Sequence, residues 1–215
     1  VIAAVYAAAG HEVIGIDINA KSVADLNNGV APVSEPGLQE LIDEAGSRLR
    51  ATTEVSVALR DSEVSYLIVP TPSNNEGVFT NQYVIQALCD IGEELRTSDR
   101  RHTVVICSTV MPGSCHGELT TALERSSGKI VGEGIGLVYS PEFIALGSVV
   151  KNMHFPDVIL IGESDAESGA IVEKNTLSVA RNTPSVQRMN MVNAEIVKLS
   201  INTFVTTKIS FANML

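Results

Sequence analysis

The stretch VIAAVYAAAGHEVIGID, from Val1 to Asp17, decides the fold. Its first nine residues are rich in alanine, which predicts the end of a helix, and Gly10 is the residue type that most often ends one. The following EVIGID is a short run rich in β-branched residues that closes on the carboxylate of Asp17. The predicted order is therefore helix, glycine, strand and acid.

This order is typical of a dinucleotide-binding βαβ unit, in which a Gly-rich phosphate turn precedes the helix and an acid closes the second strand about twenty residues further on. Counted back from Asp17, that turn falls before Val1. We therefore expect an α/β chain with a doubly wound, Rossmann-type parallel sheet. The chain is expected to begin inside its first helix, without the first strand and the Gly-rich loop, and the native protein to be longer at this end.

Asp17 is the first candidate for cofactor binding. A carboxylate at this position accepts hydrogen bonds from the adenosine ribose hydroxyls and repels a 2′-phosphate, which favours NAD over NADP. The alternative is a turn or cap residue at the end of a strand. Lys21 lies either near the same ribose or on the surface as a solvated lysine.

Three later apolar runs each end in a hydroxyl or an acid beside a proline. VSYLIVPTP contains Thr71, TVVICSTV ends on Thr109 before Met-Pro-Gly, and GLVYSPEF contains Glu142. Because ligands of doubly wound sheets bind beyond the C-terminal ends of the strands, these side chains are predicted at one rim. Thr109 could hold a water or a substrate hydroxyl, and Glu142 could orient or deprotonate a water. The alternatives are turn-stabilising hydroxyls and an exposed loop acid.

The last stretch, residues 193–215, has apolar residues at spacings of three and four and no interior Gly or Pro, which predicts a well-buried amphipathic helix. Lys198 and Asn202 stand four residues apart, so their side chains lie on one face. An ammonium and an amide are costly to bury unpaired. This face is therefore either solvated or held beside a polar group that needs them.

The composition fits a globular protein and narrows its partners. Of 215 residues 45% are hydrophobic and 19% charged, and no apolar run is long enough for a membrane span. The chain has 15 basic and 25 acidic residues, so its negative surface would repel a phosphate backbone, and nucleic acid is not an expected partner. The opening residues lack the features of a signal peptide, so we expect a cytoplasmic protein. Cys89, Cys107 and Cys115 lack metal-ligand spacing, and neither a metal site nor a disulfide framework is expected.

Five motifs, in this order and spacing, resemble the UDP-glucose/GDP-mannose dehydrogenase family. They are VSEPGL, VPTP, STVMPG, YSPEF followed by ALGS, and AEIVKLSINTF with KISFANML. The resemblance implies an enzyme that oxidises C6 of a nucleotide sugar twice, reducing two NAD, to a nucleotide uronate used in polysaccharide synthesis. It implies an NAD-binding domain over residues 1–190, incomplete at its start, and the beginning of a central helical dimerisation segment over residues 191–215. A homodimer through that helix is expected, and the nucleotide-sugar domain is expected to be absent.

The resemblance also implies roles for single residues. Asp17 and Lys21 would bind the adenosine ribose, Thr71 and Thr109 would line the nicotinamide side, and Glu142 would bind NAD or position the hydrolytic water. Lys198 and Asn202 would complete the catalytic site, where an ammonium and an amide stabilise the negative charge that develops on the sugar oxygen. The nucleotide sugar would contact Lys198 and the segment Phe143, Ile144, Ala145 and Leu146.

Two departures from the family pattern matter. Many relatives read NPEF and then an Arg-Glu-Gly type segment, where this chain has Ser140 and Ala145-Leu146-Gly147. The nucleophilic cysteine of the family lies in a later Gly-Gly-x-Cys-type motif that the chain does not reach. A thiolate is needed to trap the aldehyde for the second hydride transfer, so this fragment alone is expected to be inactive in the full reaction.

Several readings of function follow. UDP-glucose is the first substrate hypothesis, because relatives acting on N-acetylated sugars often carry Arg at the position of Phe143. GDP-mannose or another UDP-sugar is the alternative within the class. A different class is a truncated, non-catalytic NAD-binding or dimerisation module. Other β-hydroxyacid dehydrogenases also place a Lys and an Asn on a long helix, but they do not explain SPEF or STVMPG.

Overall fold

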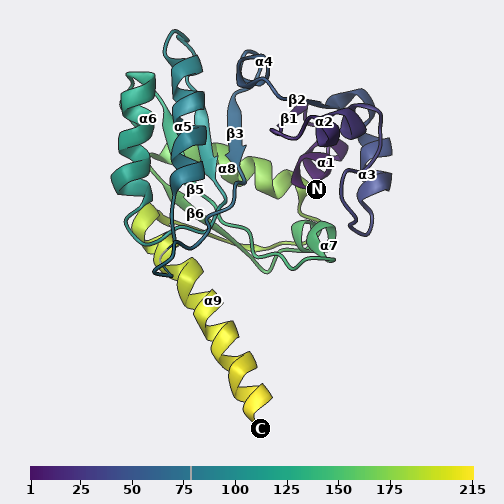
Figure 1. The fold of residues 1–215 in the computed structure, drawn as a ribbon, viewed down its shortest axis with the longest axis vertical. Helices are drawn as coiled ribbons and strands as arrows, with labels where there is room; N and C mark the ends of the chain where they lie inside the picture. The colour runs from purple at the N-terminus through teal and green to yellow at the C-terminus, as the bar shows by residue number, and fades with distance from the viewer. Residues whose placement is uncertain (78) are drawn as a thin grey trace. The chain divides into compact units, whose positions relative to one another are not determined.

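The computed structural model describes residues 1–77 and 79–215, which form two compact units. Unit 1 comprises Val1–Ser62, Phe143–Ile159 and Glu173–Ser185, and unit 2 comprises Glu63–Glu142, Leu160–Val172 and Val186–Leu215. Helices alternate with mainly parallel strands in both (Figure 1). The predicted α/β, Rossmann-type fold class is therefore confirmed. The predicted strand before Val1 stays a prediction.

Unit 1 is built around a two-stranded parallel sheet. Strands β1 (Val13–Ile16) and β2 (Leu49–Thr52) pair in register from Val13 with Leu49 to Ile16 with Thr52. Its helices are α1 (Ile2–Ala8), α2 (Ala20–Asn27), α3 (Leu38–Ala45), α4 (Val55–Leu59) and α7 (Val149–His154), with a 3₁₀ turn at Gly46–Arg48. The predicted order of helix, Gly10, strand and Asp17 is found at the start of this unit.

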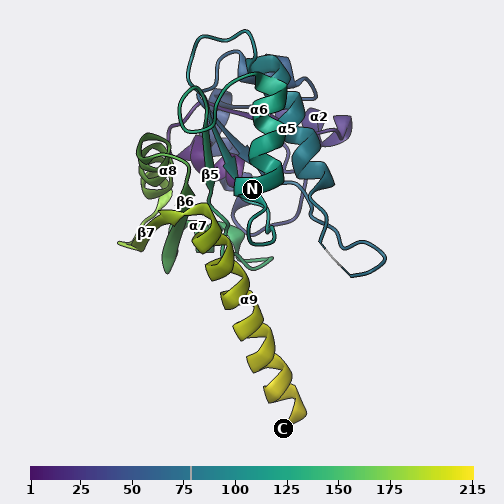
Figure 2. The same cartoon turned by 90° about the vertical axis from the view of Figure 1, so that its left-hand side faces the viewer.

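Unit 2 contains a five-stranded sheet in the order β3-β4-β5-β6-β7. The strands are β3 (Val64–Leu67), β4 (Thr103–Ile106), β5 (Gly136–Tyr139), β6 (Val158–Glu163) and β7 (Ser185–Asn190), β6 and β7 each including residues assigned to unit 1. β3, β4 and β5 are parallel, whereas β6 runs antiparallel to β5. Helices α5 (Gln82–Leu95) and α6 (Thr120–Ser127) lie side by side along this sheet (Figures 1 and 2). β4 and β5 are buried throughout, as parallel strands covered on both faces require.

Three helical segments connect these strands. The segment Val149–His154 forms the short helix α7. Helix α6 is preceded by a π-helical stretch, η2 (Cys115–Leu119). Helix α8 (Ala166–Val179) has residues in both units.

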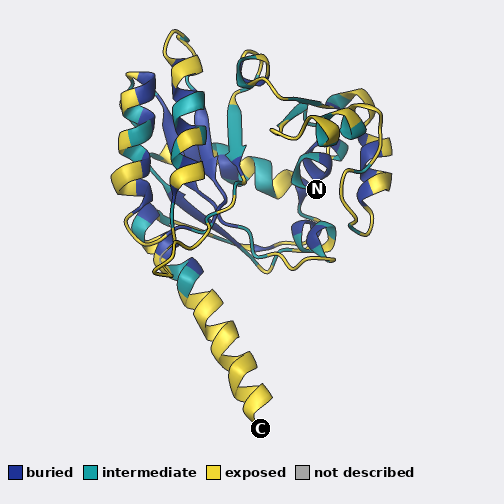
Figure 3. Ribbon diagram, in the orientation of Figure 1, coloured by how far each residue is buried: buried dark blue, intermediate teal, exposed yellow. Residues whose placement is uncertain are grey.

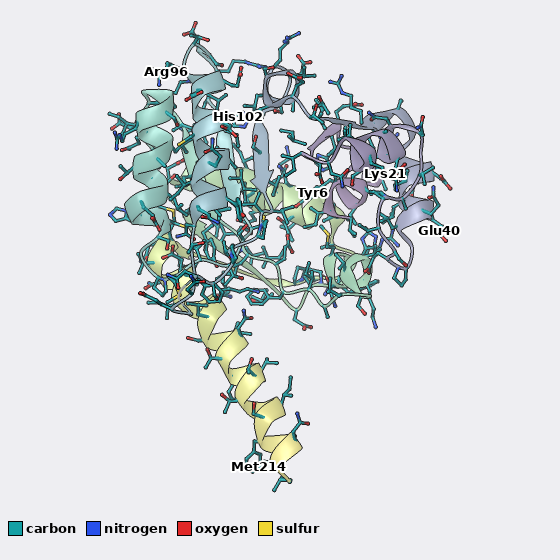
Figure 4. All side chains as sticks on the ribbon, in the orientation of Figure 1. Tyr6, Lys21, Glu40, Arg96, His102 and Met214 are labelled. Carbon is teal, nitrogen blue, oxygen red and sulfur yellow. The ribbon has the colours of Figure 1, made fainter. Side chains whose placement is uncertain are left out.

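The last helix, α9 (Met191–Met214), has the predicted length but not the predicted burial. Only its first turns are buried, at Met191, Ala194, Glu195 and Lys198, and every residue from Ile201 onward is exposed (Figure 3). Side chains stand out around its second half as far as Met214 (Figure 4). The prediction of a well-buried helix is therefore wrong for this chain alone, because no described residue of unit 2 covers the distal apolar residues.

None of the helices in the described ranges is both long and apolar enough to cross a bilayer. Among the same residues, no group of three His, Cys, Asp or Glu side chains could hold a metal ion. Cys89, Cys107 and Cys115 are free thiols.

A glycine in β6 sets how closely α9 approaches the sheet. A Cβ built on Gly162 would lie 2.8 Å from both the Ala194 Cβ and the Met191 Cα. We expect Gly162→Ala to lower the free energy of unfolding by about 1–3 kcal/mol, because the first turn of α9 must move. Thermal or urea unfolding checks this. Gly117→Ala is the control, since its added Cβ meets nothing within 4 Å, and equal stability of the two variants would contradict the prediction.

Candidate active site

The ends of β3 and β4 are joined by hydroxyl groups. The Ser108 Oγ accepts a hydrogen bond from the Val69 amide at 3.1 Å and donates to the Val69 carbonyl at 2.6 Å. The Thr71 hydroxyl donates to the Thr109 carbonyl at 2.9 Å. Thr71 and Thr109 are thus held at neighbouring strand ends. The half-buried Thr109 hydroxyl makes no hydrogen bond to any residue that the structure describes, so it can bond to a ligand.

The end of β5 positions Glu142. The Ser140 amide donates to the Ile106 carbonyl at 3.0 Å, and the Ser140 hydroxyl donates to the Leu160 carbonyl at 3.1 Å. Ser140 and Pro141 are buried. The serine that departs from the family pattern therefore fixes the strand end, and Glu142 follows as a half-buried acid rather than an exposed one.

Lys198 reaches this strand end from α9. Its side chain is almost fully buried, and its ammonium donates to the backbone carbonyl of Glu142 at 2.5 Å. Asn202, one turn further along α9, is exposed, and its side chain makes no hydrogen bond within the described part of the chain. The structure thus brings Lys198 and Glu142 together, and it leaves Asn202 exposed on the same face, one turn beyond the buried part of α9.

The two charged groups influence each other. Burial raises the pKa of the Glu142 carboxyl, the Lys198 charge lowers it, and the result is about 7. Burial lowers the pKa of the Lys198 ammonium, and the Glu142 charge opposes this. A carboxyl with a pKa near neutrality beside an ammonium is the pairing expected of a proton acceptor and a charge stabiliser.

Asp17 and Lys21 lie in unit 1. Asp17 follows β1 and is exposed, with its Oδ1 accepting a hydrogen bond from the Asn19 amide at 2.8 Å. The Lys21 side chain is 87% exposed and forms an ion pair with Asp25 at 3.8 Å. Asp17 therefore offers a carboxylate at a strand end as predicted, whereas the local contact of Lys21 agrees with the alternative of a surface lysine.

The segment Phe143–Leu146 also lies in unit 1 and is shaped by side chains from elsewhere in it. The Glu35 carboxylate accepts hydrogen bonds from the amides of Gly147, at 3.0 Å, and Val149, at 2.7 Å. The Asn152 side chain accepts a hydrogen bond from the Ala145 amide at 3.0 Å. Of the four residues, Ile144, Ala145 and Leu146 are exposed and Phe143 is half-buried.

Sequence reasoning missed two acids that organise these segments. Glu35 belongs to the VSEPGL motif, which was noted only as a family signature. Glu195 is completely buried and was treated as part of an apolar helix pattern. An acid three residues before Lys198 on an otherwise apolar stretch is a signal that could have identified it.

Comparisons with known proteins identify the family of the chain. The model of the UDP-glucose/GDP-mannose dehydrogenase family, NAD binding domain, matches residues 1–177. The chain belongs to this family. The GDP-mannose 6-dehydrogenase of Pseudomonas putida is 38% identical over 208 residues, which cover 96% of the chain and 47% of the relative. The UDP-glucose 6-dehydrogenase of Haloferax volcanii is 38% identical over 215 residues, covering 99% of the chain and 50% of the relative.

A crystal structure of a ternary complex of the Pseudomonas aeruginosa GDP-mannose dehydrogenase superimposes with a TM-score of 0.94. It shares 34% identity and covers 99% of this chain and 48% of that one. The chain thus spans about half the length of the relatives that it matches.

As a member of the UDP-glucose/GDP-mannose dehydrogenase family, the chain carries an NAD-binding domain. The residues fit this cofactor within each unit. An exposed carboxylate after β1 suits ribose hydroxyls and not a 2′-phosphate. In unit 2, the half-buried Thr109 hydroxyl offers a polar contact at the C-terminal end of a parallel strand, where nucleotides bind in such sheets.

Proposed function

We propose that this chain is the NAD-binding part of a nucleotide-sugar 6-dehydrogenase that oxidises the sugar C6 alcohol. The observation that carries the proposal is the Lys198 ammonium held at Glu142, whose carboxyl has a pKa of about 7. Such a pair can accept a proton and stabilise an oxygen that becomes negative, as oxidation of an alcohol requires.

In the first oxidation, the residues of this chain act on the alcohol proton and oxygen. Bound NAD would accept the hydride from C6. The Lys198 ammonium stabilises the negative charge on the sugar oxygen, and the hydroxyl proton passes to the Glu142 carboxylate, directly or through a water held by Thr109. Asn202 adds an amide donor to the same oxygen once the substrate and the rest of the protein enclose it.

We assign Asp17, with Lys21 nearby, to the adenosine ribose, and Thr71 and Thr109 to the nicotinamide side. Thr71 acts through its hydrogen bond to the Thr109 carbonyl, which orients the end of β4. Glu142 contacts the nicotinamide side as well as the reacting alcohol.

UDP-glucose is the proposed nucleotide sugar, and the backbone of the segment Phe143, Ile144, Ala145 and Leu146 is its proposed contact. Phe143 supports a sugar without an N-acetyl group. GDP-mannose is the second candidate, because the Pseudomonas putida relative at 38% identity is a GDP-mannose 6-dehydrogenase.

The second oxidation needs a thiolate that these residues do not supply. Burial raises the pKa of the Cys107 thiol, with the Glu142 charge adding to the effect, and burial and the Glu195 charge raise that of Cys115. Both thiols therefore stay neutral, and a buried neutral thiol is a poor nucleophile. We propose that the nucleophile comes from a further domain and that this fragment alone does not complete the reaction.

We further propose a homodimer through α9. Phe204, Phe211 and Ile209 are more than half exposed, and Pro112 with the α9 face from Ile196 to Thr207 lines a groove of about 590 Å³. An apolar surface of this kind on an exposed helix marks a protein contact, and a second copy offers the same apolar face.

Phe204→Glu should convert the dimer to a monomer, because it buries a carboxylate in an apolar contact. Light scattering coupled to size-exclusion chromatography gives the molar mass. Thr206→Glu, at an exposed position that does not line the groove and points away from Phe204, is the control and should leave the dimer intact. A wild-type monomer, or an unchanged mass for Phe204→Glu, would contradict the proposal.

The function itself is tested with the complete protein that contains this chain. Incubation with NAD and UDP-glucose should yield two NADH per sugar, and the same assay with GDP-mannose ranks the second candidate. If no nucleotide sugar yields NADH while NAD binds, the chain is an NAD-binding or dimerisation module instead.

A further inference from the structure

Glu195 is a buried acid without a counter-ion. It is 0% exposed, and no ion pair involving it is found among the residues described. Its Oε2 accepts a hydrogen bond from the Gly113 amide at 2.6 Å, and its Oε1 accepts one from the Cys115 amide at 2.8 Å. Two charge-assisted hydrogen bonds to fixed backbone groups compensate the burial of the carboxylate and also fix its position.

The two amides belong to the turn that follows Thr109. Gly113 has a φ of +91°, a backbone conformation that only glycine adopts without strain. The amides precede or begin η2, where the first amides of a helix have no partner within it. Glu195 therefore ties α9 to the loop that leaves β4.

Lys198 lies one turn after Glu195 on the same side of α9. In the same part of the helix, Ala194 packs against the sheet at Gly162, and a Cβ on Gly162 would clash with the Ala194 Cβ. The start of α9 is thus held on the sheet by close packing and on the Met-Pro-Gly turn by two hydrogen bonds. These contacts fix the position of α9 from which the Lys198 ammonium donates to the Glu142 carbonyl.

The surroundings of Glu195 are otherwise neutral. Burial and then the Glu195 charge raise the pKa of the Cys115 thiol. Burial raises the pKa of the Tyr139 hydroxyl, and the charges of neighbouring groups, including Glu195, add to this effect. The nearby Val110 backbone opposes it only in part. Because these neighbours stay protonated, no second charge competes for the carboxylate, which the two backbone amides and a side-chain hydrogen bond from the Cys115 thiol hold in place.

We propose that Glu195 is a positioning residue, which holds Lys198 against Glu142 by fixing the start of α9 on the turn after β4. The proposal deepens the dehydrogenase function above and rests on it for its effect on turnover. Its effect on the Glu142 carboxyl does not depend on any activity.

The test uses Glu195→Gln in the complete protein. Glutamine keeps the length but places an NH₂ group against one of the two amides, so α9 shifts and the ammonium withdraws from Glu142. Since the Lys198 charge lowers the pKa of Glu142, we expect that pKa to rise, as followed by ¹³C NMR of the carboxyl carbon. The value of kcat should fall by about 10- to 100-fold with little change in the KM for NAD.

Two further variants separate positioning from folding. Asn190→Ala removes the side chain that caps α9 at the Asn193 amide, 2.9 Å away, and should lower Tm without changing the Glu142 pKa or kcat. Glu195→Asp keeps the charge but is too short for both amides, and serves if Glu195→Gln does not fold; it should raise the pKa in the same direction.

An unchanged Glu142 pKa in the folded Glu195 variant would overturn the inference, whatever the loss of Tm. A wild-type protein that makes no NADH would instead reject the dehydrogenase function, and the carboxyl titration would still decide the role of Glu195.

Discussion

Lys198→Met should lower kcat for NADH formation by about 100- to 1,000-fold, the cost of removing one preorganised donor from a developing oxyanion. Methionine preserves most of the volume of the lysine stem, which is almost fully buried, so the first turns of α9 keep their packing. The lost component is the ammonium that now donates to the Glu142 carbonyl at 2.5 Å. Single-turnover NADH absorbance with the nucleotide sugar measures the effect.

The KM for NAD should change little, because the ammonium acts on the sugar oxygen. Lys174→Met is the matched control, since Lys174 is an exposed lysine on α8 outside the proposed site. It should retain wild-type turnover. If Lys198→Met turned over at the wild-type rate, Lys198 would be a structural lysine and the catalytic proposal would fail.

The parts of the fold that follow from local pattern could be predicted from the sequence. The run from Val1 to Asp17 forms helix, turn and strand, and Thr71, Thr109 and Glu142 follow β3, β4 and β5. Residue types and their period decide such elements within a few positions of the chain. The short helix α7 does not follow from local pattern in the same way, because its first amide, that of Val149, donates to the remote side chain of Glu35.

Contacts between segments that are distant in the sequence could not be predicted from local pattern. The antiparallel pairing of β6 with β5 depends on a connection through α7, and the bonds of Glu195 join α9 to a turn far earlier in the chain. The burial of α9 was overestimated because periodicity reports an apolar helix but not what covers it. Lys198 and Asn202 lie on one face as predicted, yet Lys198 is buried and Asn202 exposed, because the burial of α9 against the rest of unit 2 ends between them.

Glu142→Gln should abolish a pH dependence of stability that the wild-type protein shows between about pH 4.5 and 7. The Glu142 carboxyl titrates at about 7 in the folded protein and near its ordinary pKa of 4.5 in the unfolded chain. Between these values the folded protein binds more protons than the unfolded one, so the free energy of unfolding falls as pH rises. The fall is at most about 3 kcal/mol and ends above the folded pKa.

Activity should depend on the same group with the opposite sign. Turnover rises with pH through about 7 as the carboxylate forms, and Glu142→Gln should lose this limb together with about 100-fold or more of kcat. Urea unfolding and kcat measured over the same pH series check the pH dependence of stability and of turnover.

Glu133→Gln, at an exposed acid of unit 2, is the control and should keep the pH dependence of both stability and turnover. Burial raises the pKa of the Glu142 carboxyl, and the Lys198 charge limits this rise. A pH high enough to ionise the carboxyl for proton transfer therefore also removes the stability that the buried neutral form contributes. A wild-type protein whose stability and turnover stayed flat between these pH values would contradict the assignment.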